Sequence, residues 1–511
     1  MDIQKKEVSV NIPVASLNAS AIIDSDAIVN DSKPDLLKIL QIDASVKVSK
    51  AEVMNGKMMI GGHVAYKVLY QPENASGVFS IHTGADFSHM EENSDFADGM
   101  HSCVTAEVEH LESELINSRK IKIKSVVTLG ITVELLTPVM LPLEVIGDNI
   151  QTKLGTFGGQ SKLLQKRDII TVSDSLSLPA GKPNIGSLLK SDVSLCNKDV
   201  KVIAGKVIIK GELAVCNLYV PEAGGLVDYC SHTLPFTEIL DAEGLNEDHM
   251  CHVRTDVEEC DFSLATDSDG DIRVINANIR VGVKISADAT VSENVVTDVY
   301  SLTDNLDIGY NTINLQNPVV TSDFDYTIKN SVRPGRGSSS ILSVYNMTAT
   351  PSITATTSYD DKLSVEGYVD LASLCITSDE NCPIMNHTEE IPFKIDVDAQ
   401  GCRSGMEMSA EVEVNNISYN LNVSGEIDVR IVLSCHTQVL EKGKIAIVNR
   451  VESTGCADNA TPSIVLYFVQ KGDTLWDIAK RYHTKTEYIE ELNGENCNPL
   501  KCGSQLLIPR G

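Results

Sequence analysis

Residues 56–73 read Gly56-Lys-Met-Met-Ile-Gly-Gly62-His-Val-Ala-Tyr-Lys-Val-Leu-Tyr-Gln-Pro-Glu73. The stretch recurs 149 residues later as Gly205-Lys-Val-Ile-Ile-Lys-Gly211-Glu-Leu-Ala-Val-Cys-Asn-Leu-Tyr-Val-Pro-Glu222, with nine of eighteen positions identical. A weaker third copy, Asp361-Lys-Leu-Ser-Val-Glu-Gly367-Tyr-Val-Asp-Leu-Ala-Ser-Leu, begins 156 residues further on. Self-similarity at a nearly fixed period is typical of a chain built from repeated structural units. The sequence therefore predicts three related domains in tandem.

Within each copy, apolar and polar residues alternate with a period of two, and Gly, Asn and Asp bound the runs. Such alternation is typical of half-buried antiparallel strands. A second strand pair follows each copy, for example Ile272-Arg-Val-Ile-Asn-Ala-Asn-Ile-Arg-Val. We predict a short helical patch before each copy, at 35–40, 186–190 and 340–345. The fold class that we expect is mainly β, with each repeat a sandwich or an open barrel.

The domain boundaries follow from a second recurring stretch. Asp148-Asn149-Ile150 returns as Asp304-Asn305-Leu306, at the same offset of 156. We therefore predict repeats over residues 1–147, 148–303 and 304–455, followed by a separate C-terminal module over 456–511. The stretches most typical of linkers are 155–159 and 333–339. They are either linkers or loops inside a copy, because copies that share long N-terminal strands would have no free linker.

The C-terminal segment, 467–509, has a pattern of its own. Its first residues, Tyr-Phe-Val-Gln, suit a short strand, because three of them are β-branched or aromatic. Asp473 or Thr474 can then cap a helix, since a short side-chain oxygen accepts an N–H group of the first turn. Apolar residues fall at i, i+3, i+4 and i+7 on one face of this helix: Leu475, Ile478, Ala479 and Tyr482.

A second helix and a second strand complete the segment. Thr486 can cap the helix, Ile489 and Leu492 are expected to point inward, and Asn493-Gly494 should end it. The apolar run 506–508 then favours a strand. The predicted order is β-α-α-β.

These residues resemble a LysM module. The motifs that carry the resemblance are Tyr467-x-Val469, Lys471-Gly-Asp-Thr-Leu-Trp476-x-Ile478-Ala479, Leu492-Asn493, and Gly503 with Leu507-Ile508-Pro509. The resemblance implies a shallow groove for N-acetylglucosamine-containing glycans, formed by the loops 472–475 and 495–501. It implies that the partner-binding residues lie in the groove and on its flank: Lys471, Gly472, Asp473, Thr474, Leu475, Trp476, Asn493, Asn498, Pro499 and Leu500.

Trp476 is the only tryptophan of the chain, and two interpretations of it stay open. It could pack beside Leu475 as part of the core of the module. Alternatively, it lies on the flank, because the inward stripe is already complete and Trp476 is about 100° away from its first member. A partly exposed indole on that flank would be a strong candidate for binding a partner, since it offers a large apolar area and one N–H donor.

The formal net charge of the 511-residue chain is −29. The segment from Tyr467 onward holds six Lys/Arg and six Asp/Glu, so the excess of acidic residues lies upstream. An acidic surface repels phosphate, so we expect neither nucleic acid nor anionic lipid as a partner. The first residues lack the apolar core of a signal peptide, and the most apolar run, 126–143, is interrupted by Glu134, Pro138 and Pro142. We expect a cytoplasmic protein without membrane insertion.

Signals of catalysis and of cofactor or metal binding are missing from the sequence. It contains no phosphate-binding glycine loop, no H-E-x-x-H and no G-x-S-x-G, and no pair of carboxylates recurs between the copies. Thirteen cysteines without a C-x-x-C pair indicate reduced thiols. The cluster of His249, Cys251, His252 and Cys260 lacks zinc-ligand spacing, and 267–271 predicts a hairpin turn rather than a calcium loop. We expect no enzyme, no metal and no cofactor.

Three β repeats that carry a Gly-Lys-x-x-Ile-x-Gly…Leu-Tyr strand, followed by a LysM module, resemble the SPOCS-domain proteins of spore-forming clostridia. The resemblance spans the whole chain. It implies a mother-cell adaptor that helps to lay the coat around the forespore, and whose LysM module docks on the coat-basement ATPase, stage IV sporulation protein A. The alternative is a LysM-mediated binder of peptidoglycan glycans in the spore cortex or cell wall, with the repeats as spacers. The two hypotheses differ in compartment, because a wall binder needs export.

Overall fold

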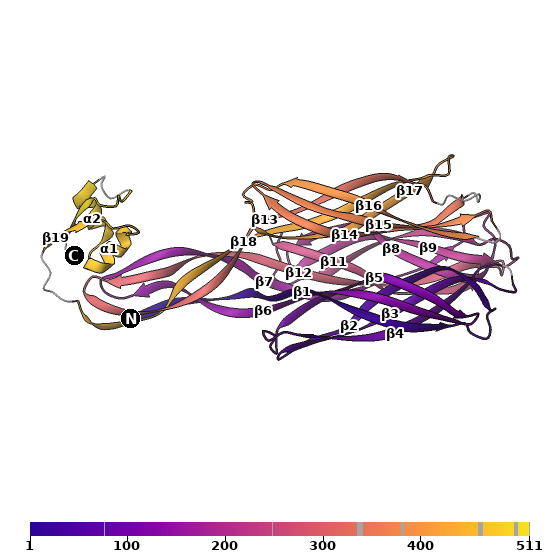
Figure 1. Cartoon of the computed structure of the whole chain (residues 1–511), viewed down its shortest axis with the longest axis horizontal. Helices are drawn as coiled ribbons and strands as arrows, with labels where there is room; N and C mark the ends of the chain where they lie inside the picture. Colours follow the sequence, from indigo (N-terminus) through magenta and orange to yellow (C-terminus); the bar gives the residue numbers. More distant parts are fainter. Residues whose placement is uncertain are drawn as a thin grey trace.

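The computed structural model describes the chain except for residues 76, 248, 335–340, 380–382, 458–462, 495–498 and 510–511. Strands dominate the described residues, and two short helices lie near the C-terminus. Figure 1 shows an elongated molecule with a wide body, a narrower stalk of long strands and a small C-terminal module at the end of the stalk. The expected mainly β fold, followed by a small β-α-α-β module, is confirmed.

Each repeat consists of six antiparallel strands in the same order. The first repeat has β1 (Asp2–Ile28), β2 (Leu36–Met54), β3 (Lys57–Pro72), β4 (Phe79–Glu92), β5 (His101–Asn117) and β6 (Lys120–Ile146). The second has β7 (Ile150–Ser177), β8 (Ile185–Ile203), β9 (Lys206–Pro221), β10 (Asp228–Asp241), β11 (Met250–Thr266) and β12 (Ile272–Ser301). The third has β13 (Asp304–Val332), β14 (Ile341–Tyr359), β15 (Lys362–Thr377), β16 (Ile384–Asp398), β17 (Glu407–Leu421) and β18 (Ile427–Cys456).

The six strands of a repeat form two sheets. In the first repeat one sheet has the order β1-β6-β5 and the other β2-β3-β4, and the other repeats follow the same plan. The sheets pack face to face, so that Ile23 of β1 and Ile121 of β6 share a core with Met58 and Tyr66 of β3. The edges also adjoin, since β5 lies beside β2 and β4 beside β1. Each repeat is therefore a sandwich that approaches a flattened barrel.

The quoted stretch forms a tight turn and the central strand of the second sheet. Gly56 and Gly205 have positive φ angles, 77° and 75°, in the turns before β3 and β9. Asp361, with a φ of 58°, takes the same place in the third repeat. Gly tolerates the left-handed region at no steric cost, and Asp tolerates it better than most residues. The turn therefore explains which residues begin the copies.

The second glycine of each copy lies directly opposite a phenylalanine of the neighbouring strand. The three pairs are Gly62–Phe87, Gly211–Phe236 and Gly367–Phe393. A Cβ atom on Gly62 would lie 2.5 Å from the Phe87 ring and 2.6 Å from the carbonyl oxygen of Lys47. The ring thus covers a strand position that has no side chain of its own. This contact accounts for the recurrence of both residue types.

The helical patches predicted before each copy are wrong, because β2, β8 and β14 are strands from their first residues onward. Each strand starts with two register shifts three residues apart, which in β2 fall at Leu36/Lys38 and Ile39/Gln41. The shifts recur at matching positions of β8 and β14. A β-bulge inserts one extra residue into a strand. At a bulge, residues on the same face of the strand are three positions apart instead of two, which resembles the i, i+3 spacing of a helix.

The stalk is an extension of the long strand pairs. The fifth strand of each repeat pairs with the sixth strand only as far as Glu134, Asp288 or Leu440 of the sixth strand. Beyond these residues, the first and sixth strands continue as a two-stranded ribbon. The apolar side chains of the three ribbons meet in two small clusters, which are Val8, Val10, Leu141, Phe157, Val295 and Ile447, and Val145, Val296, Val299, Val448 and Val451. A single ribbon is marginally stable in water. Packing of the three ribbons on one another therefore stabilises the stalk.

The two stretches typical of linkers lie inside repeats. Residues 155–159 belong to β7, within the stalk. A Cβ atom on Gly155 would lie 2.6 Å from the Thr297 methyl group, and one on Gly158 would overlap the Asn317 side chain of the third ribbon. These glycines let the ribbons approach closely. The other stretch follows β13 within the third repeat, and 335–339 lie outside the described residues.

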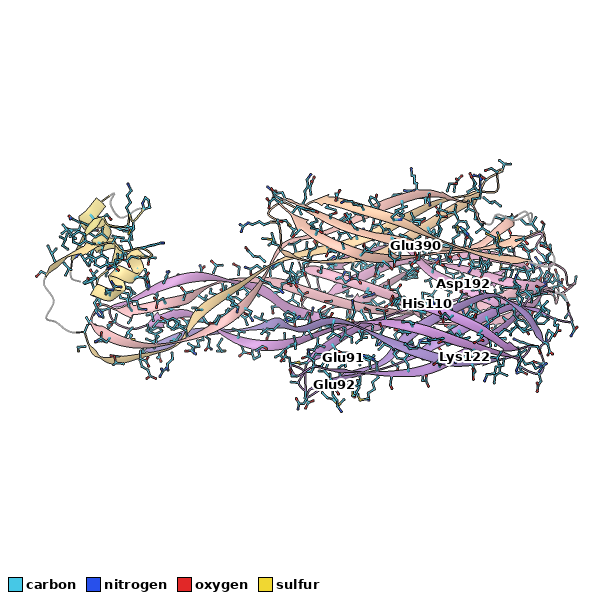
Figure 2. The ribbon with its side chains drawn as sticks, in the orientation of Figure 1. Glu91, Glu92, His110, Lys122, Asp192 and Glu390 are labelled. Atoms are coloured by element: carbon cyan, nitrogen blue, oxygen red, sulfur yellow. The ribbon has the colours of Figure 1, made fainter. Side chains whose placement is uncertain are left out.

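A buried lysine joins the repeats where their second sheets meet. Lys190 has 7% of its side chain exposed, and its ammonium lies 2.6 Å from Asp43 of the first repeat and 3.0 Å from Asp192. Figure 2 labels Asp192 within the wide body. Burial alone would lower the pKa of Lys190, but the two carboxylates outweigh it and hold the pKa above its ordinary value. Around this ion cluster, the three repeats share apolar contacts of Leu69, Val78, Leu189, Leu218, Val227, Tyr345, Leu374, Ile376 and Ile384.

The C-terminal module comprises β19 (Ile464–Phe468), α1 (Leu475–Tyr482), α2 (Thr486–Asn493) and β20 (Gln505–Pro509). The two strands pair antiparallel, with Leu466 opposite Leu507. The module lies at the end of the stalk, beside the strands of the second repeat (Figure 1). Among the described residues, neither helix has the length and apolar character that crossing a membrane requires.

We predict that Gly62→Ala lowers the free energy of unfolding by about 1–3 kcal/mol, because the added methyl group overpacks the Phe87 ring. Gly61 is the matched control, since a Cβ atom there would lie 3.7 Å from Lys50 Cβ, an ordinary contact distance. Gly61→Ala should change stability by less than about 0.5 kcal/mol. Urea denaturation measures both variants, and equal stability of the two would contradict this explanation of the repeated glycine.

We predict that Lys190→Ala lowers the free energy of unfolding by about 2–4 kcal/mol, because it leaves Asp43 and Asp192 without their counter-charge. Lys201, on the same strand, is the control, since its side chain is 65% exposed and lies 3.9 Å from Asp199. Lys201→Ala should cost less than about 1 kcal/mol, as expected for a surface ion pair. Thermal unfolding tests the comparison, and a Lys190 variant as stable as the control would rule out an important role for the buried pair.

Candidate functional site

The helices of the C-terminal module begin and end close to their predicted positions. The exposed Thr474 caps α1, since its Oγ1 accepts a hydrogen bond from Asp477 N at 3.2 Å. Gly494, with a φ of 60°, ends α2. Two expectations are wrong: Thr486 is the first residue of α2 rather than its cap, and Leu492 is 44% exposed. The short helix α2 packs its Ile489 side against the sheet, which leaves Leu492 outside the core.

Asp473, one of the predicted partner-binding residues, closes the loop after β19. Its Oδ2 accepts hydrogen bonds from the Tyr467 hydroxyl at 2.6 Å and from Gln470 N at 2.8 Å. The hydrogen bond from Tyr467 is the main cause that lowers the pKa of the Asp473 carboxyl. Gly472 provides the positive φ, 96°, that the turn requires. Asp473 and Gly472 therefore shape the loop, whereas Lys471 is exposed on it.

Asn493 is part of the scaffold of the module. Its Nδ2 donates to Leu507 O at 2.6 Å, and its Oδ1 accepts from Leu507 N at 2.7 Å. This pairing imitates a neighbouring strand at the outer edge of β20. Of the other residues predicted for the second loop, Pro499 is exposed and Leu500 packs half-buried against the core of the module. Asn498 lies outside the described residues.

Trp476 lies on the flank of α1, against the stalk. Its Nε1 donates to Asp298 Oδ2 at 2.7 Å, and its ring meets Tyr300 edge to face with 4.9 Å between centroids. The indole is half-buried as a result, and Leu475 beside it is half-buried too. Neither interpretation of Trp476 from the sequence included this contact, because Asp298 precedes it by 178 residues.

Asp298, on β12, lies at the centre of the contact between the stalk and the module. Besides Trp476, the Lys480 ammonium at 2.6 Å and the Tyr310 hydroxyl at 2.7 Å donate to its carboxylate. Burial alone would raise the pKa of this carboxyl, but the three donors outweigh it and hold the pKa below its usual value. Asp298 is therefore ionised at neutral pH and pairs with Lys480 across the boundary.

Tyr300 and Ser301 extend this contact. The Tyr300 hydroxyl donates to Thr484 O at 2.7 Å, and His483 Nδ1 donates to Ser301 O at 2.7 Å. Tyr300 is 3% exposed, and burial raises the pKa of its hydroxyl to about 12, so it stays a donor at neutral pH. We call this set the tip contact; it comprises Asp298, Tyr300 and Ser301 of the stalk, and Trp476, Lys480, His483 and Thr484 of the module.

The opposite side of the module is apolar and exposed. On β19, Ile464, Leu466 and Phe468 are 55%, 51% and 54% exposed, and Leu507 of β20 is 40% exposed. We call these four residues the outer face. Sequence reasoning missed it, although a signal was present: all five residues of β19 are apolar or aromatic. A sheet with one covered face needs apolar residues only at alternate positions.

The histidine–cysteine cluster around His252 is used in a contact between repeats. His252 Nε2 lies 2.9 Å from Glu411 Oε2 of the third repeat, and the ring is 4.7 Å from that of His436. In the described part of the chain, no three His, Cys, Asp or Glu side chains gather in a way that could hold a metal ion. The predicted hairpin turn over 267–271 is confirmed, since it joins β11 to β12.

Comparison with known families separates the chain into four parts. The family model of the SipL SPOCS domain matches residues 35–116, 184–265 and 340–422, which cover the second to fifth strands of each repeat to within one residue. The family model of the LysM domain matches residues 467–509. No curated protein and no solved structure matches the chain. The chain therefore contains three SPOCS domains of the SipL type, followed by a C-terminal LysM domain.

Proposed function

We propose that this chain is a non-enzymatic structural adaptor of endospore coat assembly, whose LysM domain docks on stage IV sporulation protein A at the forespore surface. The SPOCS domains support a role in sporulation, and the LysM domain is of a glycan-binding type. The ATPase as partner, and the mother-cell side of the forespore as location, come from the resemblance of the whole chain to SPOCS-domain proteins.

The outer face is the observation that favours a protein as the partner of the LysM domain. Its four side chains are large, apolar and between 40% and 55% exposed. A contiguous exposed apolar patch is typical of a binding surface, and protein–protein contacts are one common kind. A glycan presents hydroxyl groups, which lose hydrogen bonds when an apolar surface removes their water. A protein with a complementary apolar surface would instead gain binding energy from burying these residues.

The polar groups of the predicted groove are partly engaged within the domain. Asp473 binds Tyr467 and Gln470, and Asn493 binds both backbone groups of Leu507. These side chains cannot donate or accept the same hydrogen bonds with a sugar. The outer face is therefore our first candidate for the docking surface. The predicted groove and flank, from Lys471 to Trp476 and over 498–500, are the second.

The repeats support the role of an adaptor through their arrangement. Lys190 joins the first two sandwiches, all three share the apolar cluster beside it, and their ribbons pack together in one stalk. Figure 1 shows the LysM domain at the end of this stalk, away from the wide body. Because the stalk holds the LysM domain away from the body, the two parts can contact different partners at the same time, as a coat adaptor must.

Binding of N-acetylglucosamine glycans in the cortex or wall is the second candidate function. The match to the LysM family favours it, because that family binds such glycans between the two loops that flank the helices. In this case Lys471, exposed on the first loop, would face the sugar.

We predict that Phe468→Glu in the full-length protein weakens binding to stage IV sporulation protein A by about a hundredfold or more, because a charge enters an apolar contact. The fold should survive, since 54% of Phe468 is exposed. Lys471→Glu, which changes charge on the glycan loop instead, should bind within about fivefold of the unmodified chain, as expected for a residue at the rim of an interface. Isothermal titration calorimetry measures the affinities.

Sedimentation with insoluble peptidoglycan separates the two candidate functions. The glycan function is favoured by two results together. The unmodified chain would sediment with peptidoglycan and Lys471→Glu would not, and neither the unmodified chain nor its variants would bind the ATPase tightly. If Phe468→Glu binds the ATPase as tightly as the unmodified chain, the outer face is not the docking surface.

We predict that removal of residues 458–511 abolishes localisation around the forespore but leaves the body folded. The last strand of the body ends at Cys456, which pairs with Asp304, so this truncation keeps every ladder of the three repeats. Fluorescence microscopy of a tagged chain reports localisation, and circular dichroism reports folding. A truncated protein that still encircles the forespore would show that the repeats, and not the LysM domain, determine localisation.

A further inference from the structure

The tip contact covers the flank of α1, while the outer face on the other side of the LysM domain stays exposed. Trp476 and Lys480 lie one helical turn apart and both donate to the Asp298 carboxylate, which is 19% exposed. Hydrogen bonds to an ionised and largely buried acceptor are stronger than those between neutral or exposed groups. The LysM domain is therefore held in one orientation by the stalk and not merely joined to it.

The residues that hold the domain are particular to the second repeat. Val299 of β12 lies opposite Thr152, and its counterparts Val145 and Val451 lie opposite Ile3 and Ile308. The residue before each valine is Asp298 in the second repeat, and Glu144 and Arg450 in the others. The residue after it is Tyr300 in the second repeat, and Ile146 and Glu452 in the others. A carboxylate beside an aromatic ring therefore occurs at this place once in three repeats.

We propose that the tip contact is an intramolecular lock, which keeps the flank of α1 covered until the LysM domain leaves the stalk. In the closed arrangement Trp476 gives its single N–H to Asp298 and packs its ring on Tyr300. Another protein can use neither group until the contact opens. The lock concerns the flank of α1, so the proposal does not rest on which partner binds the outer face.

The chemistry of the lock also defines what the open flank would bind. Release exposes an indole and an ammonium one turn apart on α1. In the stalk, this pair accommodates a carboxylate next to a tyrosine ring. A protein surface that presents an acidic side chain beside an aromatic residue therefore competes directly with Asp298 and Tyr300. Binding of such a partner and closure of the lock exclude each other, which makes the contact autoinhibitory for this surface.

Trp476 reports on the lock without any label, because the chain contains no other tryptophan. Asp298→Asn removes the charge that pairs with Lys480, and should raise the ratio of open to closed molecules by roughly tenfold or more. We expect the emission of Trp476 to shift to longer wavelength and its quenching by acrylamide to increase. Glu144→Gln, the equivalent position of the first repeat, is the matched control and should change neither.

Lys480→Met opens the lock from the other side and should produce the same shift in emission. Amide hydrogen exchange of α1 and α2 distinguishes release from unfolding, because a released domain keeps its slowly exchanging amides. If both variants leave the emission and quenching of Trp476 unchanged, the contact is not a lock and the proposal is overturned. Loss of the slow amides in both variants would overturn it as well, since the contact would then belong to the fold of the domain.

Discussion

The pairing of the first strand of each repeat with its last strand is the constraint on which the rest of the structure depends. In the first repeat this ladder runs from Asp2 and Ile146 to Ile28 and Lys120. It joins residues that are far apart in sequence, so its loop-closure entropy must be offset by the core between the two sheets. Because the same ladders continue beyond the sheets, they also form the stalk. The stalk, in turn, determines which surface of the LysM domain is covered, because Asp298, Tyr300 and Ser301 bind the flank of α1 and the residues that follow it.

The strands and turns of the repeats could be predicted because their signals are local. Period-two alternation and a residue suited to positive φ, such as Gly56, are visible in a short stretch of sequence. The partner of Gly62 was not predictable in this way, since Phe87 becomes its neighbour only when β3 and β4 pair. The bulges at the start of β2 are a stronger case. They depend on the register with β3, and they place Leu36 and Ile39 at a spacing that favours a helix.

The candidate site shows the same division between local and distant signals. Thr474 and Gly494 end up where capping rules place them, because a cap needs only the residues of one helix turn. Nothing local distinguishes Asp298 from the other acidic residues of a chain with a net charge of −29. Its role arises from the stalk, which brings the second repeat to the LysM domain. The outer face was closer to being predictable. The residues of β19 are apolar on both faces of the strand, whereas a sheet that is covered on one face buries only every second residue.

The LysM domain and the stalk are linked more closely than two domains joined by a chain. The buried cluster of the LysM domain contains eight residues, and one of them, Tyr300, belongs to the second repeat. A core this small gains much from one large aromatic side chain, because small domains bury a low fraction of their surface. Binding at the outer face affects the lock only if a partner prefers one arrangement of the domain over the other. Trp476 joins the core of the domain to Asp298. A partner that binds β19 and shifts α1 would therefore prefer either the open or the closed arrangement. The outer face and the flank of α1 would then be coupled through the LysM domain itself.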